Sequence, residues 1–303
     1  MRSLIAALLI TLSGLTPAWA VTALLYQPLL ADRRVAESDW PQIFDDVRRF
    51  GFDTLVLQWT RYGSAFADGA ERLWLESRVQ QARNAGLRII IGLAADPSFF
   101  DRLNQSREAL EVYLRRLTID DVALAERWAR TLPPDAIAGW YLPAEIDDQN
   151  WRDPQRAQLL ADHLSASVVR LEAVLARPIY ISSFFTGKMH PQRYLELLAS
   201  LRSTGVRLWV QDGRGTGVLF EAERHLYLKP LLDCPVTPID SLIHELFVQD
   251  RSSPTFSATG IGQAQTKQLL DAQPPCRGRR IFFELRYLPG IDQRMGTART
   301  RSD

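Results

Sequence analysis

The chain has 303 residues, a formal net charge of +1 at pH 7 and 46% hydrophobic residues. This near-neutral charge argues against nucleic-acid binding as the main task. The length fits one large α/β barrel or two small domains.

The first 20 residues have the pattern of a secretory signal peptide. Met1-Arg2 gives a positive start, an apolar run extends from Leu4 to Leu12, and Ala18-Trp19-Ala20 has the small-x-small form of a cleavage site. The apolar run is shorter than the about 20 residues that a membrane-spanning helix needs. We therefore predict that residues 1–20 are removed, which leaves a periplasmic or secreted protein without stable membrane insertion. An uncleaved membrane anchor is the alternative.

Eight short β-rich runs alternate with stretches of helical length along the rest of the chain. The predicted strands are Ala23–Gln27, Thr54–Trp59, Arg88–Leu93, Ile137–Leu142, Pro178–Ser183, Val206–Gln211, Ser241–Leu246 and Arg280–Leu285. The predicted helices are Asp39–Phe50, Leu73–Ala85, Arg107–Leu132 (as two helices), Pro154–Leu175, Pro191–Ser203 and, more weakly, residues 218–232 and 261–272.

Strand–helix alternation of this kind implies a parallel sheet, because each helix returns the chain to the same edge. Eight units over this length fit a single closed (β/α)₈ TIM barrel over residues 21–288. After the last strand the chain continues with Pro289-Gly290 and an Arg-rich stretch. We expect residues 289–303 to be a flexible tail and the outer ring to lack its last helix.

The chain has two cysteines, Cys234 and Cys276. In an exported protein such a pair suggests a disulfide, and each precedes a strand on the predicted bottom of the barrel. Two free thiols are the alternative. No histidine lies at ligand spacing from either cysteine, so we expect no metal site there.

In such barrels the active site forms at the carboxyl ends of the strands. Polar residues follow the predicted strands at those ends, while glycines such as Gly51 and Gly86 follow the helices at the opposite ends. The polar candidates for substrate binding are Gln27, Gln58, Tyr141, Asp147, Gln211, Asp212, Glu284 and Tyr287.

Glu145 and Glu245 form the most specific pair in the sequence. Glycoside hydrolysis needs one carboxyl group as an acid and another as a base or nucleophile, on opposite sides of the bond. The two glutamates end the fourth and seventh predicted strands, which lie on nearly opposed sides of an eight-stranded ring. The alternative is that each forms an ion pair with a rim arginine, and Glu284 could replace either member.

Four tryptophans lie near the predicted rim. We expect Trp59 and Trp151 to be exposed platforms on which a sugar ring stacks, and Trp140 and Trp209 to pack in the core, because they lie within strands. The motifs of other chemistries, such as a Gly-x-Ser-x-Gly elbow or a P-loop, are missing from the sequence. We expect no cofactor and no catalytic metal.

Several of these segments together resemble an uncharacterised bacterial family of TIM-barrel proteins with glycoside-hydrolase-like character, domain of unknown function 4434. The matching pieces are residues 27–28, 51–59, 139–148, 211–213, 245–247 and 287–289. The resemblance implies a sugar-hydrolase-like rim, with Glu145 and Glu245 at the strand positions that many retaining glycosidases use. Ala144 differs from those barrels, where an asparagine often precedes the acid.

The sequence thus predicts an exported, monomeric glycoside hydrolase that acts on a polysaccharide or oligosaccharide, with Glu145 as acid/base and Glu245 as nucleophile. We favour retention of configuration over inversion. The alternative is a non-catalytic carbohydrate-binding barrel that assists the export or assembly of an exopolysaccharide, and Ala144 slightly favours it.

Overall fold

The computed structural model describes residues 22–234, 237–253, 257–272 and 280–296. The predicted signal peptide, Cys276 and the end of the predicted tail lie outside these ranges. Signal cleavage and the Cys234–Cys276 disulfide therefore stay predictions.

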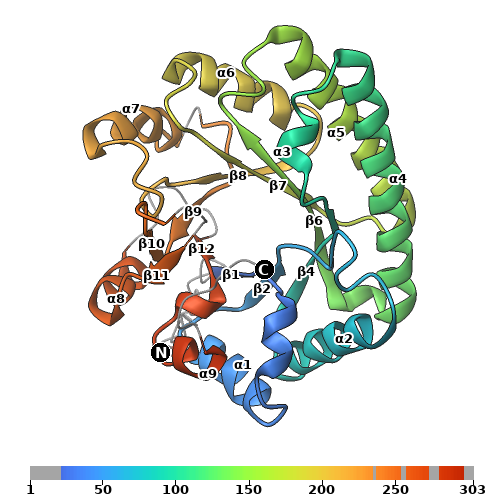
Figure 1. The fold of residues 1–303 in the computed structure, drawn as a ribbon, viewed down its shortest axis with the longest axis vertical. Helices are drawn as coiled ribbons and strands as arrows, with labels where there is room; N and C mark the ends of the chain where they lie inside the picture. The colour runs from blue at the N-terminus through green and yellow to red at the C-terminus, as the bar shows by residue number, and fades with distance from the viewer. Residues whose placement is uncertain (1–21, 235–236, 254–256, 273–279, 297–303) are drawn as a thin grey trace, which may run out of the picture.

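Eight parallel strands close into a barrel, in the order β1-β2-β4-β6-β7-β8-β9-β12, and β12 pairs back to β1 (Figure 1). The barrel strands are β1 (Thr22–Tyr26), β2 (Thr54–Leu57), β4 (Arg88–Gly92), β6 (Ile137–Asp147), β7 (Ile179–Phe184), β8 (Arg207–Gln211), β9 (Ser241–Glu245) and β12 (Arg280–Phe283). Each corresponds to one predicted strand, and the predicted TIM-barrel fold is confirmed.

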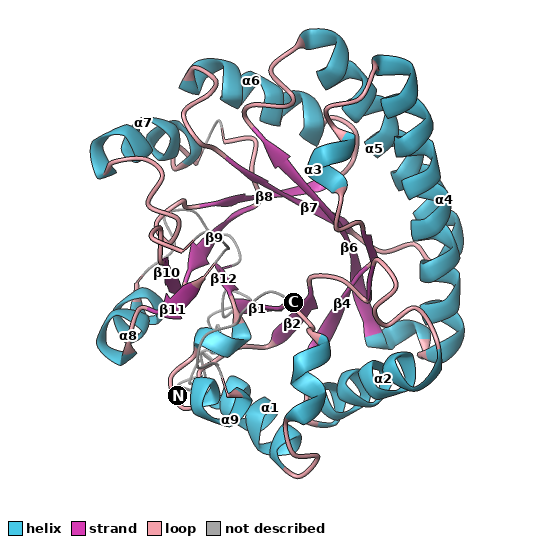
Figure 2. Cartoon of the chain, viewed as in Figure 1, coloured by secondary structure: helices cyan, strands magenta, loops and turns pink. Residues whose placement is uncertain are grey.

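Helices cover the outside of the barrel, as the ring of helices around the strands in Figure 2 shows. They are α1 (Asp39–Arg49), α2 (Gly69–Asn84), α3 (Phe99–Arg102), α4 (Arg107–Thr131), α5 (Pro154–Val174), α6 (Pro191–Arg202), α7 (Glu221–Leu231), α8 (Gln263–Asp271) and α9 (Ile291–Met295). Three 3₁₀ turns, η1 (Leu30–Arg34), η2 (Pro134–Ala136) and η3 (Leu285–Tyr287), connect them to strands.

Local sequence signals explain where these helices begin and end. The Asp153 carboxylate accepts hydrogen bonds from the amides of Gln155 and Arg156, both at 3.0 Å, and so caps the start of α5. Gly51 and Gly86 follow α1 and α2 with φ values of 89° and 83°, the left-handed conformation that ends a helix at low cost only for glycine.

Two predictions about the helices were wrong. Arg107–Thr131 is one continuous helix, because no glycine or proline interrupts it and Ser106 caps its start. Residues Ile291–Met295 form α9, which packs against α1, where the start of a flexible tail was expected. The Ile291 side chain is completely buried, and its apolar contact stabilises this short helix.

The barrel interior is filled by side chains. The rings of Tyr180 and Tyr141 lie 4.6 Å and 5.8 Å from the ring of Trp209, and all three belong to the inner apolar cluster. A second and larger apolar cluster fills the layer between strands and helices. Because the interior is closed by this packing, a ligand site has to lie at the rim.

The carboxyl-terminal rim carries two small two-stranded sheets that extend the walls. One pairs β3 (Arg61–Tyr62) with β5 (Ala94–Ala95), and the other pairs β10 (Phe247–Gln249) with β11 (Ala258–Gly260). None of the helices within the described ranges combines the length and the apolar character needed to cross a membrane.

Candidate active site

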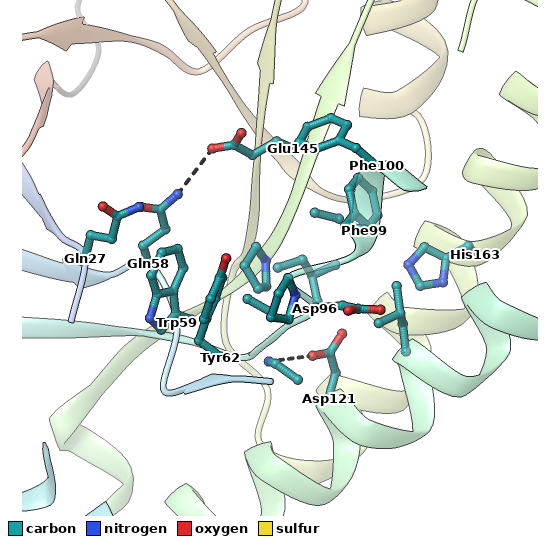
Figure 3. A pocket seen from close by; sticks show the side chains of 17 residues that line it. Gln27, Gln58, Trp59, Tyr62, Asp96, Phe99, Phe100, Asp121, Glu145 and His163 are labelled. Atoms are coloured by element: carbon teal, nitrogen blue, oxygen red, sulfur yellow. Dashed lines mark hydrogen bonds between the residues drawn. The ribbon is translucent and has the colours of Figure 1, made fainter. Parts of the chain in front are cut away.

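A cavity of about 230 Å³ opens at the carboxyl ends of β1, β2, β4 and β6 (Figure 3). Four predicted site residues line it: Gln27, Gln58, Trp59 and Glu145. The walls also include residues from the helix layer, since α4 and α5 contribute side chains to the same cavity.

Glu145 lies at an irregularity of β6, where the register with β7 shifts between Leu142 and Glu145. Its Oε1 accepts a hydrogen bond from Nε2 of Gln58 at 3.2 Å, and Gln211 also donates to the carboxylate. Burial raises the pKa of Glu145 to about 7, the hydrogen bond from Gln211 opposes this shift, and the charge of Asp147 adds to it. Glu145 can therefore hold or release a proton near neutral pH, as a general acid/base must.

Glu245, the last residue of β9, is almost completely enclosed, with 1% of its surface exposed. Its Oε2 accepts a hydrogen bond from the amide of Gly215, and Oε1 has no partner within the described residues. Burial raises the pKa of Glu245 most, and the negative charge of Asp212 raises it further. The charge of Glu145 raises the pKa of Glu245 as well, by less than burial and Asp212 do.

The end of β8 connects these two glutamates. Gln211 donates to Glu145, and the adjacent Asp212 acts electrostatically on Glu245. Asp212 is 3% exposed; its Oδ1 accepts from the amide of Arg214 at 3.1 Å, and its Oδ2 lies 3.5 Å from Nδ1 of His244. This strand end therefore influences the protonation of both members of the pair.

Aromatic side chains form one wall of the cavity. The ring of Trp59 lies 4.7 Å from the ring of Tyr62 at an angle of 31°, and the indole nitrogen donates to the carbonyl of Pro28 at 2.9 Å. Trp59 is 7% exposed and Tyr62 is 39% exposed. The exposed aromatic surface predicted for Trp59 therefore belongs mainly to Tyr62, which stands beside it in Figure 3.

The prediction that Trp151 is an exposed sugar platform was wrong. Its side chain is 1% exposed, because the turn after β6 folds the indole into the apolar layer beneath Arg156. Asp147 holds that turn: it accepts from the amide of Gln149 at 2.7 Å and from Nδ2 of Asn150 at 2.6 Å. Tyr141 is likewise enclosed, and its hydroxyl lies 2.7 Å from Oγ of Ser182.

Glu284 belongs to a buried ion network at the end of β12. It accepts from Nε of Arg286 and from the amide of Gln27, the latter at 2.8 Å, and Arg286 also lies 3.3 Å from Asp32. Burial raises the pKa of Glu284, although Arg286 and the Gln27 amide favour its charged form. The neighbouring Tyr287 lines a separate surface groove beside α8 and α9, away from Glu145.

Comparison with known proteins identifies the family. The family model described as "Domain of unknown function (DUF4434)" matches residues 22–268. The chain belongs to the DUF4434 family. It is also 41% identical over 285 residues to the "Uncharacterized protein YbcH" of Escherichia coli (strain K12), covering 93% of this chain and 95% of that protein. The resemblance seen in the sequence is thereby confirmed.

Among solved structures, this DUF4434 chain is similar to a class V chitinase from Pseudomonas fluorescens Pf-5. The TM-score is 0.50 at 12% sequence identity, and the match covers 92% of this chain and 99% of the chitinase chain. At this identity the similarity shows a shared TIM-barrel fold and nothing about the chemistry.

Three other side chains with polar groups that line the cavity were not predicted from the sequence: Tyr62, Asp121 and His163. For Asp121 the sequence does hold a signal, since it interrupts an apolar stripe of α4 that includes Leu117 and Leu124. His163 interrupts the apolar stripe of α5 in the same way. Within the described ranges, no group of three or more His, Cys, Asp or Glu side chains is arranged to hold a metal ion.

Proposed function

We propose that this chain is a glycoside hydrolase that cleaves a polysaccharide or oligosaccharide, with Glu145 as acid/base and Glu245 as nucleophile. The observation that carries the proposal is that Glu145 and Glu245 lie at the carboxyl ends of two barrel strands, β6 and β9, on the same rim, where Glu145 lines a cavity with an aromatic wall. A glycosidase needs one carboxyl protonated and the other ionised at the same pH. Burial holds the pKa of Glu245 at about 8, above the value of about 7 for Glu145, so the assigned roles require the pKa of Glu245 to fall below that of Glu145 when its covering loop opens.

In the first step, protonated Glu145 gives its proton to the glycosidic oxygen while the Glu245 carboxylate attacks the anomeric carbon. The glycosidic bond breaks, the leaving sugar departs as an alcohol, and a glycosyl ester forms on Glu245. In the second step, Glu145 takes a proton from water, whose oxygen attacks the anomeric carbon and frees Glu245. This route retains the configuration of the sugar.

The surrounding residues have roles that suit this sequence of steps. Gln58 and Gln211 hydrogen-bond the Glu145 carboxylate and stabilise its charged form after proton transfer. Tyr62 and Trp59 offer an aromatic wall for the apolar face of a sugar ring. Gln27 lines the same cavity and could bind sugar hydroxyl groups.

We also propose that the protein acts in the periplasm or outside the cell, as a monomer. The signal-peptide pattern of residues 1–20 supports this location. A polymeric carbohydrate outside the cytoplasm is the substrate class consistent with export.

A non-catalytic carbohydrate-binding barrel is the second candidate. The enclosure of Glu245 favours it, because Gly215 covers the carboxylate and leaves 1% of the residue exposed. Under the hydrolase proposal, the loop that contains Gly215 has to move before a sugar reaches Glu245.

Release of reducing ends from a panel of bacterial exopolysaccharides separates the two candidates. We expect release by the wild type and losses of about 100-fold or more in Glu145→Gln and Glu245→Gln. Glu196→Gln is the matched control, since Glu196 lies on α6 with 50% of its side chain exposed, away from the rim. Absence of release by the wild type, together with measurable glycan binding, would favour the binding barrel.

A further inference from the structure

The cavity beside Glu145 reaches from the rim into the helix layer. Glu145 and Gln58 line it at the strand ends, and Asp121 of α4 and His163 of α5 line it on the helix side (Figure 3). Its volume of about 230 Å³ is below the ~300–1,000 Å³ that is typical of sites for drug-sized ligands. The inner part of the cavity, at Asp121 and His163, therefore suits one substituent of a sugar, while the sugar ring itself stays at the rim beside Tyr62.

Asp121 is a buried carboxyl group that the proposed hydrolysis does not use. It is 4% exposed, and its Oδ1 accepts a hydrogen bond from the amide of Ala94 at 2.9 Å. The other oxygen, Oδ2, has no hydrogen-bond partner among the described residues, and the side chain lines the cavity. Oδ1 is thus occupied by a hydrogen bond from the backbone, and Oδ2 is available to a ligand.

The surroundings of Asp121 favour a neutral ligand. The cavity near it is walled by apolar side chains that include Phe99, Leu117 and Ala144. His163 lies there as well, with Nδ1 3.0 Å from Oγ1 of Thr118, and burial lowers its pKa to about 4. An ammonium group would lose its hydration on entering such a pocket, which makes a charged partner unfavourable.

The protonation of Asp121 agrees with this geometry. Burial raises the pKa of its carboxyl group to about 8, and the Ala94 amide and the charge of Arg61 only partly oppose this shift. At neutral pH the group is therefore mainly protonated and can donate a hydrogen bond from Oδ2. The other titratable groups around it are Asp120 and Tyr113 on α4, Asp96 after β5 and His163 on α5.

We infer that the inner end of this cavity binds the acetamido substituent of a sugar whose glycosidic bond lies at Glu145, with Asp121 donating to the acetamido carbonyl oxygen. The acetyl methyl group packs against the apolar wall. An amide carbonyl is a strong uncharged acceptor, and the methyl group matches the apolar lining. This inference rests on the proposed function, and it narrows the substrate class to polymers that contain N-acetylated amino sugars.

Calorimetric titration tests the inference without any need for turnover. The protein carries Glu245→Gln throughout, because Glu245 does not line this cavity. The probes are β-1,4-linked tetramers of N-acetylglucosamine, of glucose and of glucosamine. We expect the N-acetylglucosamine tetramer to bind at least about tenfold more tightly than the other two at pH 6.5, and to lose this advantage at pH 9.

Two substitutions of Asp121 separate donation from a structural role. Asparagine keeps an oxygen for the Ala94 amide and an N–H donor for the ligand, so Asp121→Asn retains the preference for the acetamido tetramer and also keeps it at pH 9. Asp121→Leu keeps the branched shape of the side chain without a donor, and it loses the preference. Asp162→Asn, on the exposed side of α5, is the control and behaves as its parent.

Three results would overturn the inference: equal binding of the three tetramers, an unchanged preference in Asp121→Leu, or tighter binding of the glucosamine tetramer that Asp121→Asn abolishes. The last result would identify an ionised carboxylate that binds an ammonium group. Hydrolysis is measured separately by reducing-end release. An acetamido preference without hydrolysis would refute the proposed function alone, and hydrolysis without that preference would refute this inference alone.

Discussion

Gln58, immediately after β2, donates from its Nε2 to Oε1 of Glu145 on β6, across 3.2 Å. The contact joins two strand ends that are 87 residues apart in the chain. It favours the charged form of Glu145 and so opposes the effect of burial on the pKa of that carboxyl group.

Removal of this hydrogen bond should change the pH dependence of catalysis. In Gln58→Leu the pKa of Glu145 rises above its wild-type value of about 7, because the charged form loses a donor. The alkaline limb of the kcat/KM profile therefore moves to higher pH, measured by reducing-end release on the polymer that the wild type cleaves. Gln80→Leu, on the exposed face of α2, keeps the wild-type profile. If the alkaline limb does not shift in Gln58→Leu, Glu145 is not the group whose deprotonation lowers kcat/KM.

Gly215 is close enough to the backbone of Phe247 that a side chain does not fit. A Cβ atom at this position would lie 2.7 Å from the Phe247 carbonyl oxygen and 2.8 Å from its ring. Gly215→Ala therefore displaces the loop and lengthens the hydrogen bond from the Gly215 amide to Glu245. Because the hydrolase proposal requires this loop to leave Glu245 before a sugar binds, we expect kcat/KM to rise in Gly215→Ala, and a lower kcat/KM would contradict that opening. Gly217→Ala is not a suitable control, because the φ of 58° at Gly217 would add strain to an alanine. Folding is checked instead by the melting temperature of Gly215→Ala, which should equal that of the wild type.

The buried Arg286 should matter for stability. It pairs with Glu284 and Asp32, and all three side chains are at most 4% exposed. Arg286→Met leaves two buried carboxyl groups without their cation, which costs about 3–5 kcal/mol in the free energy of unfolding. Urea unfolding measures this cost.

Arg193→Met is the comparison for that experiment. Arg193 forms an exposed ion pair with Glu196 on α6, and such pairs contribute about 0–1 kcal/mol. Equal losses in the two variants would mean that the Arg286 network contributes no more than a surface pair.

Asp121 should make the protein less stable as the pH rises. Its pKa is about 8 in the folded chain, against about 3.9 in an unfolded one. Between these values the folded chain holds a proton that the unfolded chain has released. The contribution of this group to the free energy of unfolding is therefore largest below the lower pKa and falls by about 1.4 kcal/mol per pH unit up to the higher one.

Asp121→Asn removes this titration and keeps the acceptor for the Ala94 amide. Relative to the wild type, the variant gains stability progressively from pH 5 to pH 7, as measured by urea unfolding. A constant difference between the two proteins over that range would mean that Asp121 is ionised in the folded chain throughout.

Much of the fold could be predicted because the barrel strands are short apolar runs between clear helix signals. Ile89, Ile90 and Ile91 of β4 are all buried, as expected for a strand covered on both faces. The rim position of Glu145 followed from the same pattern, since it comes directly after an apolar strand. The contact between Gln58 and Glu145 could not be predicted, because it depends on the register shift within β6.

The exposure of single side chains was harder to predict than the strand, helix or turn in which they lie. Trp151 lies in a turn, where an exposed ring was expected, yet Asp147 folds that turn so that the indole enters the core. Asp121 was missed because a helix pattern does not reveal which strand end the helix packs behind. Both depend on packing between segments that are distant in the sequence.

The most direct test of the account is kcat/KM for Glu145→Gln, Glu245→Gln and the double variant on the polymer that the wild type cleaves. Carboxyl groups that act as a unit give non-additive losses. We predict that each single variant loses about 100-fold or more and that the double variant loses little beyond the more damaged single one. Two losses that multiply in the double variant, or a single variant with wild-type kcat/KM, would contradict the paired roles of Glu145 and Glu245.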